Sequence, residues 1–333
     1  MIDKAPAGIS RDELRKVLGE AKGKKVAEYR HPDPEVSINL TVTEPSLQIQ
    51  GSWKKIVLKQ PGGMAARMGF GHFVWNSRFP PLYFGLVKLR VTGHLYIFGG
   101  EWGTEGPFYE DFWCLDLKKM DKWRQLPAYW LPASIVGHYY GWSFSVYEDK
   151  AYMFTGLSIV DCFDLKKEKW SSIKCTFEGP GEFPVADKWV DFTTQTANGK
   201  LYVFGGTWKK SQLGCNVLLE LDIRKQKWRL LSGTSMPTQD DLSPGPRRYT
   251  SSWVDKKQES LFILYGEADR QGAMIHAQLN ADANGFGYDD FWSWNFKEKK
   301  WTRQKIHGNS PCARSEMGTT YVSLFSIQSS RVS

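Results

Sequence analysis

Three side chains near the start of the chain have the types and the spacing of metal ligands. His31, Asp33 and Glu35 alternate along the segment HPDPE, and imidazole and carboxylate groups are common ligands of divalent metals. The two residues between them are prolines, which fix the backbone dihedral φ and favour extended or turn conformations. We therefore interpret this segment as an exposed turn and predict that it binds no metal.

The other candidates for catalysis are spread along the chain. The histidines follow no metal-ligand spacing, and no Ser/His/Asp or Cys/His arrangement can be assembled from the sequence. The five cysteines are odd in number and contain no CxxC pair, which is typical of reduced packing residues. We predict that the chain is not an enzyme, with no catalytic residues, no metal site and no cofactor. The histidines are His31, His72, His94, His138, His276 and His307.

Composition and charge exclude several classes of protein. Hydrophobic residues make up 41% and charged residues 24% of the 333 residues, which indicates a globular chain. The sequence has no apolar run of about 18 residues and no secretory signal at its start, so we predict a cytoplasmic or nuclear protein without a membrane partner. Much of the net charge of +8 comes from lysines in predicted turns. We interpret these lysines as solvated turn residues that protect strand edges, in preference to a nucleic-acid surface.

One pattern occurs four times and must position any site in this chain. Its first copy, LYIFGGEWGTEGPFYEDFWCLDLKKMDKW at 95–123, has an apolar strand, a glycine pair, a second strand that ends at Asp116, and a Lys-Trp pair. Another strand candidate precedes each glycine-ended strand, so every copy offers four strands. A four-stranded unit cannot bury both faces alone, and radial packing of such units gives a β-propeller. The further copies lie at 151–170, 201–228 and 261–301.

The glycine pairs and the tryptophans give the chain a family resemblance. From about residue 51 to residue 323 it resembles the kelch-repeat β-propellers of the galactose-oxidase-like central-domain superfamily. Glycine allows a close approach of backbones, and a large Trp fills the wedge between neighbouring blades. The residues that we assign to the structural repeat are Gly99, Gly100, Gly156, Gly205, Gly206, Gly266, Trp53, Trp123, Trp170, Trp228 and Trp301.

The predicted fold is all-β, with four clear four-stranded antiparallel blades and an incomplete closing blade. Residues 1–50 are expected to form a short helix and an extended arm, and residues 51–333 the propeller. We interpret the insert at 76–93 as foreign to the repeat. The blades are predicted at about 66–126, 135–173, 185–231 and 245–304, and the closing blade from 51–58 with 311–325.

Arg67, Arg247 and Arg314 recur just before or at the start of predicted first strands. First strands line the central channel of a propeller, so these arginines would gather at one mouth. There they could bind an acidic segment of a partner, because a guanidinium forms forked hydrogen bonds with a carboxylate. Alternatively, each arginine bonds carbonyls or carboxylates of the adjacent blade and fixes the blade spacing. Both interpretations remain open at this point.

The loops between second and third strands are the predicted binding surface. In kelch proteins these loops project on the face that is commonly used for binding, and here their lengths differ strongly. Exposed aromatic and arginine side chains dominate binding hot spots. We predict partner-binding roles for Trp102, Tyr109, Trp208, Lys209 and Arg270, in addition to the three arginines.

Two functions follow from the resemblance. We predict a protein-interaction scaffold or adaptor; the alternative is a propeller-type enzyme. Copper oxidases similar to galactose oxidase need two histidines, two tyrosines and a cysteine cross-linked to one tyrosine, and the scattered histidines do not indicate such a set. Propellers similar to nitrile-specifier proteins bind iron through a Glu, an Asp and a His spaced four apart. Glu267, Asp269 and His276 share one loop, but their intervals are two and seven.

Overall fold

We analysed a computed structural model, which describes twelve stretches of the chain. The chain divides into two compact units, Met1–Lys59 and Gln60–Ser333. The predicted N-terminal helix and arm, the insert up to residue 92 and Trp53 lie outside the described residues. The described residues are 57–59, 62–75, 93–102, 109–129, 143–156, 158–179, 181–184, 189–207, 215–234, 242–268, 286–305 and 315.

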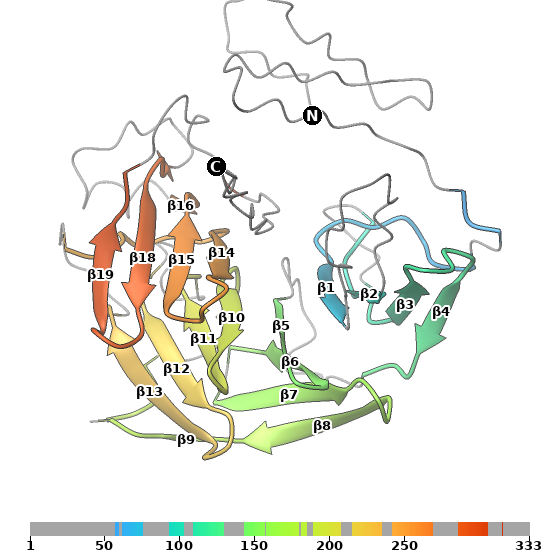
Figure 1. Ribbon diagram of the computed structural model, residues 1–333, viewed down its shortest axis with the longest axis horizontal. Helices are drawn as coiled ribbons and strands as arrows, with labels where there is room; N and C mark the ends of the chain where they lie inside the picture. Colours follow the sequence, from blue (N-terminus) through green and yellow to red (C-terminus); the bar gives the residue numbers. More distant parts are fainter. Residues whose placement is uncertain are drawn as a thin grey trace, which may run out of the picture. The chain divides into compact units, whose positions relative to one another are not determined.

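The described strands form four antiparallel blades of a β-propeller, as predicted (Figure 1). Blade A consists of β1 (Gly71–Trp75), β2 (His94–Phe98), β3 (Phe112–Asp116) and β4 (Trp123–Leu126). Blade B consists of β5 (Phe144–Tyr147), β6 (Lys150–Phe154), β7 (Ile159–Asp164) and β8 (Lys169–Lys174). Blade C consists of β10 (Thr193–Ala197), β11 (Lys200–Phe204), β12 (Leu218–Asp222) and β13 (Lys227–Ser232). Blade D consists of β14 (Ser251–Val254), β15 (Ser260–Leu264), β18 (Phe291–Asn295) and β19 (Lys300–Arg303).

The turn between the third and fourth strands explains the Asp that recurs in the repeat. In blade B, Oδ1 of Asp164 accepts hydrogen bonds from the backbone N–H groups of Lys166 and Lys167, at 3.1 and 2.8 Å. Glu168 then takes a left-handed φ of 53°, which closes the turn before Trp170. The same side-chain cap and the same left-handed position occur in the other three blades. Their capping residues are Asp116, Asp222 and Asn295, and their left-handed residues are Met120, Gln226 and Lys299.

The hydrophobic core lies between successive blades. One cluster of buried side chains joins blades A and B, a second joins B and C, and a third joins C and D. The fourth-strand tryptophans of blades B, C and D connect the same neighbours. The indole N–H of each donates a hydrogen bond to the preceding blade or to the segment that follows that blade. Trp170 bonds to the carbonyl of Pro127, and Trp228 bonds to the carbonyl of Ser158. Trp301 bonds to the hydroxyl of Ser232.

The first strands of the four blades lie next to one another. β1 contacts β5, β5 contacts β10, and β10 contacts β14, on the inner side of the blades in Figure 1. Hydroxyl and amide side chains tie these strands together: Ser145 donates to Thr194 at 3.0 Å, and Gln195 donates to the carbonyl of Ser252 at 2.9 Å. The first strands of blades B, C and D are therefore held together by side-chain hydrogen bonds.

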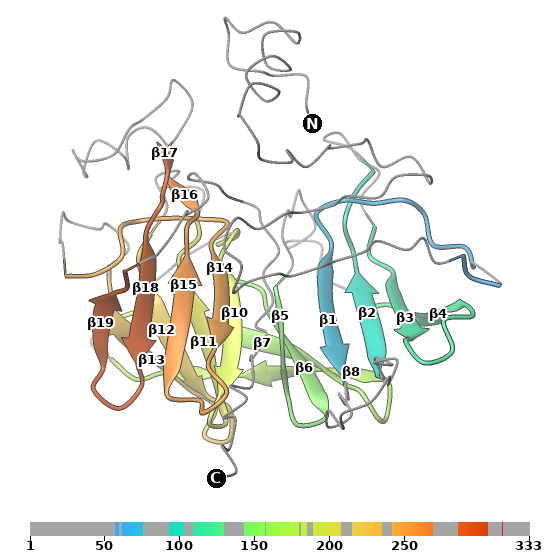
Figure 2. The same ribbon diagram turned by 45° about the horizontal axis from the view of Figure 1, so that its top comes forward.

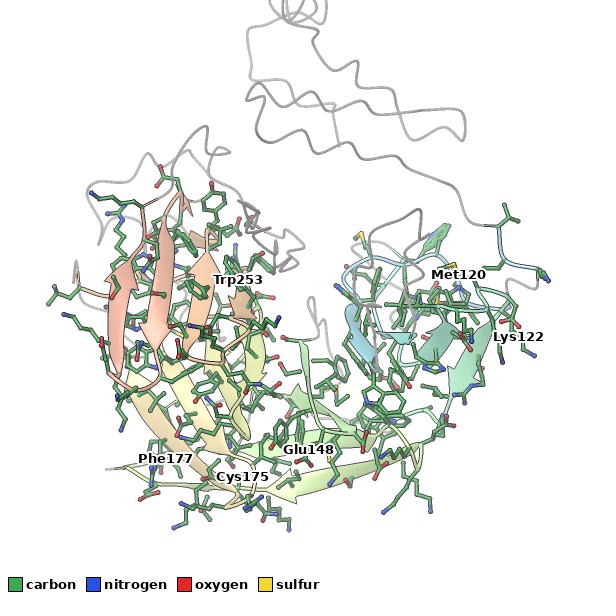
Figure 3. All side chains as sticks on the ribbon, in the orientation of Figure 1. Met120, Lys122, Glu148, Cys175, Phe177 and Trp253 are labelled. Atoms are coloured by element: carbon green, nitrogen blue, oxygen red, sulfur yellow. The ribbon has the colours of Figure 1, made fainter. Side chains whose placement is uncertain are left out.

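Blade C has an additional strand at its outer edge. β9 (Thr176–Phe177) follows β8 of blade B directly and pairs with β13 in parallel. The N–H of Thr176 donates to the carbonyl of Gln226, and the N–H of Glu178 donates to the carbonyl of Trp228. Cys175 and Phe177 mark this connection in Figure 3. A single stretch of chain thus belongs to two blades.

Candidate protein-binding face

The loops between second and third strands share one end of the blades, which we call the loop face. A short backbone bridge marks its rim in three blades. The bridges are Met68 with Glu101 in blade A, Val190 with Thr207 in blade C, and Arg248 with Glu267 in blade D. In blade D a small hairpin of β16 (Glu267–Ala268) and β17 (Phe286–Gly287) extends this end beyond β15 and β18 (Figure 2). The two backbone hydrogen bonds of each bridge fix these positions beside the ends of the strands, which favours a defined binding surface.

Arg247 lies at the loop face of blade D, and its side chain is bound within that blade. Its side chain is 0% exposed, and its Nη1 donates to the carbonyl of Tyr265 at 3.1 Å. Nη1 and Nη2 together bind both carboxylate oxygens of Asp290, with 2.9 Å from Nη2 to Oδ2. The guanidinium lies 3.7 Å from the ring centre of Tyr288, and the indole N–H of Trp292 donates to Asp290 at 2.7 Å. These residues form what we call the arginine cluster of blade D.

Blade A contains the same arrangement. Arg67 donates to the carbonyl of Gly99 at 2.9 Å and binds both carboxylate oxygens of Asp111. Its guanidinium lies 4.4 Å from the ring centre of Tyr109, and Trp113 donates to Asp111 at 2.6 Å. The two arginine clusters are therefore one structural device that is used in two blades.

Electrostatics supports a charged pair in both clusters. Burial raises the pKa of Asp290, but the charge and the hydrogen bonds of Arg247 outweigh burial, so the pKa lies below its ordinary value. At Asp111 the hydrogen bonds from Arg67 and Trp113 likewise outweigh burial and lower the pKa. Burial raises the pKa of Tyr288 to about 12, so its ring remains neutral beside the guanidinium.

In blade C, uncharged residues occupy the positions that correspond to the arginine cluster. Trp189 replaces the arginine, and its indole N–H donates to the carbonyl of Gly205 at 2.8 Å. Backbone hydrogen bonds align Val217 with the two aspartates and Cys215 with the two tyrosines. All three side chains are at most 1% exposed. The bond to the carbonyl after the second strand is thus kept, while the ion pair is replaced by apolar packing.

These contacts correct the predictions for the arginines. The side chains of Arg67 and Arg247 bond carbonyls and carboxylates of their own blades, not of the adjacent blade. The backbone of Arg247 makes the contact to the neighbour instead, because its carbonyl accepts from Gly206 and its N–H donates to Cys215. Neither guanidinium is offered to a partner, since their side chains are 2% and 0% exposed. Arg314 lies outside the described residues.

The loop of blade A presents Trp102, whose side chain is 58% exposed. Trp102 follows Glu101 at the rim of the loop face. Tyr109, predicted as a contact residue, packs half-buried against Arg67, and its N–H donates to the carbonyl of Gly100 at 2.7 Å. Trp208, Lys209 and Arg270 lie outside the described residues, so their predicted roles remain predictions.

Two features of this face were missed from the sequence. The first is the arginine cluster, although a signal was present: YEDFW at 109–113 and YDDFW at 288–292 supply its Tyr, Asp and Trp at identical spacing. The second is Glu101, a carboxylate that is only 2% exposed. No sequence pattern distinguishes a buried glutamate at the end of a strand from an exposed one.

Within the described ranges, His, Cys, Asp and Glu side chains do not come together in groups of three or more that could hold a metal ion. The same stretches contain no helix long and apolar enough to cross a membrane. Cys114, Cys162, Cys175 and Cys215 are free thiols. Burial raises the pKa of Cys175 to about 11 and that of Cys215 to about 12, so neither is an activated nucleophile at neutral pH.

Comparison with known families agrees with this architecture. The family model described as the KLHDC2/KLHL20/DRC7 Kelch-repeats domain matches residues 87–325, which is more than half of the chain. A search of curated proteins gave no match.

Proposed function

Because the chain belongs to the Kelch-repeat family, we propose that it is a protein-interaction scaffold that binds a partner protein through its loop face. Kelch propellers commonly serve as such scaffolds. The observation that carries the proposal is Trp102, a large apolar side chain that is 58% exposed at the rim of a rigid face. The tryptophans of β8, β13 and β19 are instead occupied between blades by hydrogen bonds.

Trp102 has the properties of a binding anchor. An exposed indole offers a large contact area and a hydrogen-bond donor at a small cost in side-chain entropy. Met68 lies across the backbone bridge from Glu101 and is itself 46% exposed, which extends the apolar surface. The predicted anchors Trp208, Lys209 and Arg270 belong to the corresponding loops of blades C and D. The acidic partner predicted earlier finds no support in Arg67 and Arg247, because both are occupied by aspartates.

A quantitative pull-down with the full chain tests the proposal. Trp102→Ala should lose specific partners, while Leu230→Ala should retain them. Leu230 is a suitable control because it is also an exposed apolar residue, at 41%, but lies on β13 at the outer side of blade C. Cross-linking of the wild-type chain should in addition connect its partners to residues 101–111. A partner set that Trp102→Ala leaves unchanged would contradict the proposal.

We also propose that the chain has no catalytic centre of its own and acts in the cytoplasm or nucleus. Its four described cysteines are free thiols, in keeping with a reducing compartment. Metal analysis of the purified full chain distinguishes this proposal from a metal-dependent enzyme. Stoichiometric iron or copper would contradict it, and so would recovery of the protein from a secretory compartment.

A further inference from the structure

The turns at the end of the blades opposite the loop face, which we call the turn face, fold alike but differ in charge. Figure 2 shows the turns of blades C and D at this end, opposite the hairpin of β16 and β17. In every blade the turn between the third and fourth strands exposes three lysine or arginine side chains. The same turn has two acidic side chains in blades A and B, but only one in blades C and D. These turns cover residues 116–122, 164–169, 222–227 and 295–300.

The fold does not require the additional acidic side chains. In blade D, Asn295 caps the turn in place of an aspartate, and its Oδ1 accepts from two backbone N–H groups at 2.9 Å each. The left-handed position is Glu168 in blade B, Gln226 in blade C and Lys299 in blade D, with φ of 53°, 56° and 52°. The same turn therefore forms with a negative, a neutral or a positive side chain at this position.

In blades A and B the acidic side chains of the turn face form ion pairs. Nη1 and Nη2 of Arg124 in blade A donate to the two carboxylate oxygens of Glu168 in blade B, at 2.9 and 2.6 Å. These hydrogen bonds hold the pKa of Glu168 below its ordinary value, so the carboxylate remains charged. Nζ of Lys166 lies 2.5 Å from Oδ2 of Asp149. Positive charge on this half of the turn face is therefore partly balanced within the chain.

The corresponding turns of blades C and D, 222–227 and 295–300, leave most of their cations unpaired, and we call them the basic turns. Nζ of Lys225 lies 3.8 Å from Asp222, which also caps its turn. The nearby Glu178 is taken by Arg229, at 2.9 Å. In the part of the chain that the structure describes, the other five cations of the basic turns form no ion pair. They are Arg224, Lys227, Lys297, Lys299 and Lys300.

The basic turns belong to neighbouring blades that are tied together at this end. The N–H of Asn198 in blade C donates to Oε1 of Gln258 in blade D at 2.7 Å, and Nδ2 of Asn198 donates to the carbonyl of Gln258 at 2.8 Å. Lys257, next to Gln258, is also exposed on this turn. The cations of blades C and D thus share one end of two joined blades.

We propose that the basic turns bind an acidic segment of a partner protein, at a surface separate from Trp102. A single exposed ion pair contributes little, so the segment must carry several carboxylates. Lysines suit such a segment, because their flexible stems follow charges that are spread along an extended chain. The two turns contain one arginine, Arg224, and no exposed aromatic side chain. This composition favours an acidic protein segment over single-stranded nucleic acid, whose bases stack on aromatic side chains.

Fluorescence anisotropy of a labelled peptide of about ten glutamates, titrated with the full chain, tests the inference. The wild type should bind this peptide at low ionic strength and more weakly as salt is added, because exposed charges are screened. Reversing four cations of the basic turns should weaken binding about tenfold or more. These side chains are exposed, so the melting temperature should change little. The variant is Arg224→Glu/Lys227→Glu/Lys297→Glu/Lys300→Glu.

The matched control reverses four cations at the corresponding positions of blades A and B, with the same change in net charge. It should weaken binding by no more than about threefold, since those turns are partly neutralised already. The control variant is Lys118→Glu/Lys122→Glu/Lys166→Glu/Lys169→Glu.

Equal weakening in the two variants would overturn the inference, because net charge alone would then explain binding, and so would a wild type that does not bind the peptide. Trp102→Ala should bind the peptide like the wild type; a loss there would assign the acidic segment to the loop face and overturn the inference too. A deoxythymidine decamer that binds more tightly than the peptide through the same cations would identify nucleic acid as the ligand. None of these results changes the outcome of the Trp102 pull-down, so the scaffold function is tested separately.

Discussion

Blades C and D solve the same packing problem with different chemistry. Both must fix the start of the first strand against the carbonyl that follows the second strand. Blade D uses the ion pair of Arg247 and Asp290, and blade C uses the indole of Trp189 with Val217 beside it. The feature that both blades share is a single hydrogen bond from a side-chain N–H to that carbonyl. The charged pair is one of two ways to surround it.

The two arrangements differ in how much stability the protein loses when one partner is removed. A buried ion pair gains little net stability over well-packed apolar residues, but removing one partner leaves an unpaired charge in the interior. The apolar version in blade C carries no such risk. Substitutions in blade D should therefore have larger effects than their counterparts in blade C, and the following predictions examine this difference.

The largest effect is expected for Asp290→Ala. It leaves the fully buried guanidinium of Arg247 without its carboxylate and should lower the free energy of unfolding by about 3–5 kcal/mol. Urea denaturation of the full chain measures this change. Val217→Ala at the equivalent position of blade C is the control and should cost about 1–2 kcal/mol, since it removes only apolar contacts. Equal losses in the two blades would contradict the comparison.

Gly205→Ala should follow, with a loss of about 2 kcal/mol or more. Gly205 has a φ of 72°, and a Cβ there would lie 2.6 Å from the carbonyl oxygen of Arg247 in blade D. Gly63→Ala is a matched control because a Cβ at Gly63 meets no atom within 4 Å. Thermal melts of the two variants decide the point: similar melting temperatures would show that blade C does not need glycine to receive blade D.

A transplant of the blade C solution into blade D should have a smaller effect. The double variant Arg247→Trp/Asp290→Val removes both charges together, so it should cost only about 1–2 kcal/mol, less than Asp290→Ala alone. The remaining cost comes from Trp292, whose indole N–H loses its acceptor. If the double variant is less stable than the single one, the two solutions are not interchangeable.

The smallest effect concerns pH. Because the pKa of Asp290 is lower in the folded protein, its contribution is fully present above the ordinary carboxyl pKa and is lost as the pH falls through the folded value. The wild type should lose stability below about pH 4 by on the order of 1 kcal/mol per pH unit more than the double variant. Melting temperatures between pH 3 and pH 6 measure the difference. Parallel acid profiles would show that the ion pair adds no pH dependence.

The sequence predicts the architecture well because the repeat is made of local patterns. Gly pairs, capping Asp residues and tryptophans each act within one blade or between neighbours, so four blades could be identified from spacing alone. The arginines were harder: their position was visible, but whether a guanidinium turns toward its own blade or the next depends on side-chain geometry. The burial of Glu101 could not be predicted, because it depends on contacts made in the fold, such as the bridge to Met68, which lies 33 residues away in the chain.

The β9 segment affects which blades of this propeller should unfold together. In repeat proteins each unit is stabilised mainly by its nearest neighbours, and units can open separately. Here the outer strand of blade B continues onto the outer edge of blade C, so neither can detach without breaking hydrogen bonds of the other. Blades B and C should therefore behave as one cooperative unit, with the slowest amide hydrogen exchange in the chain. Blades A and D would then exchange faster, as separable units at either end of a common centre.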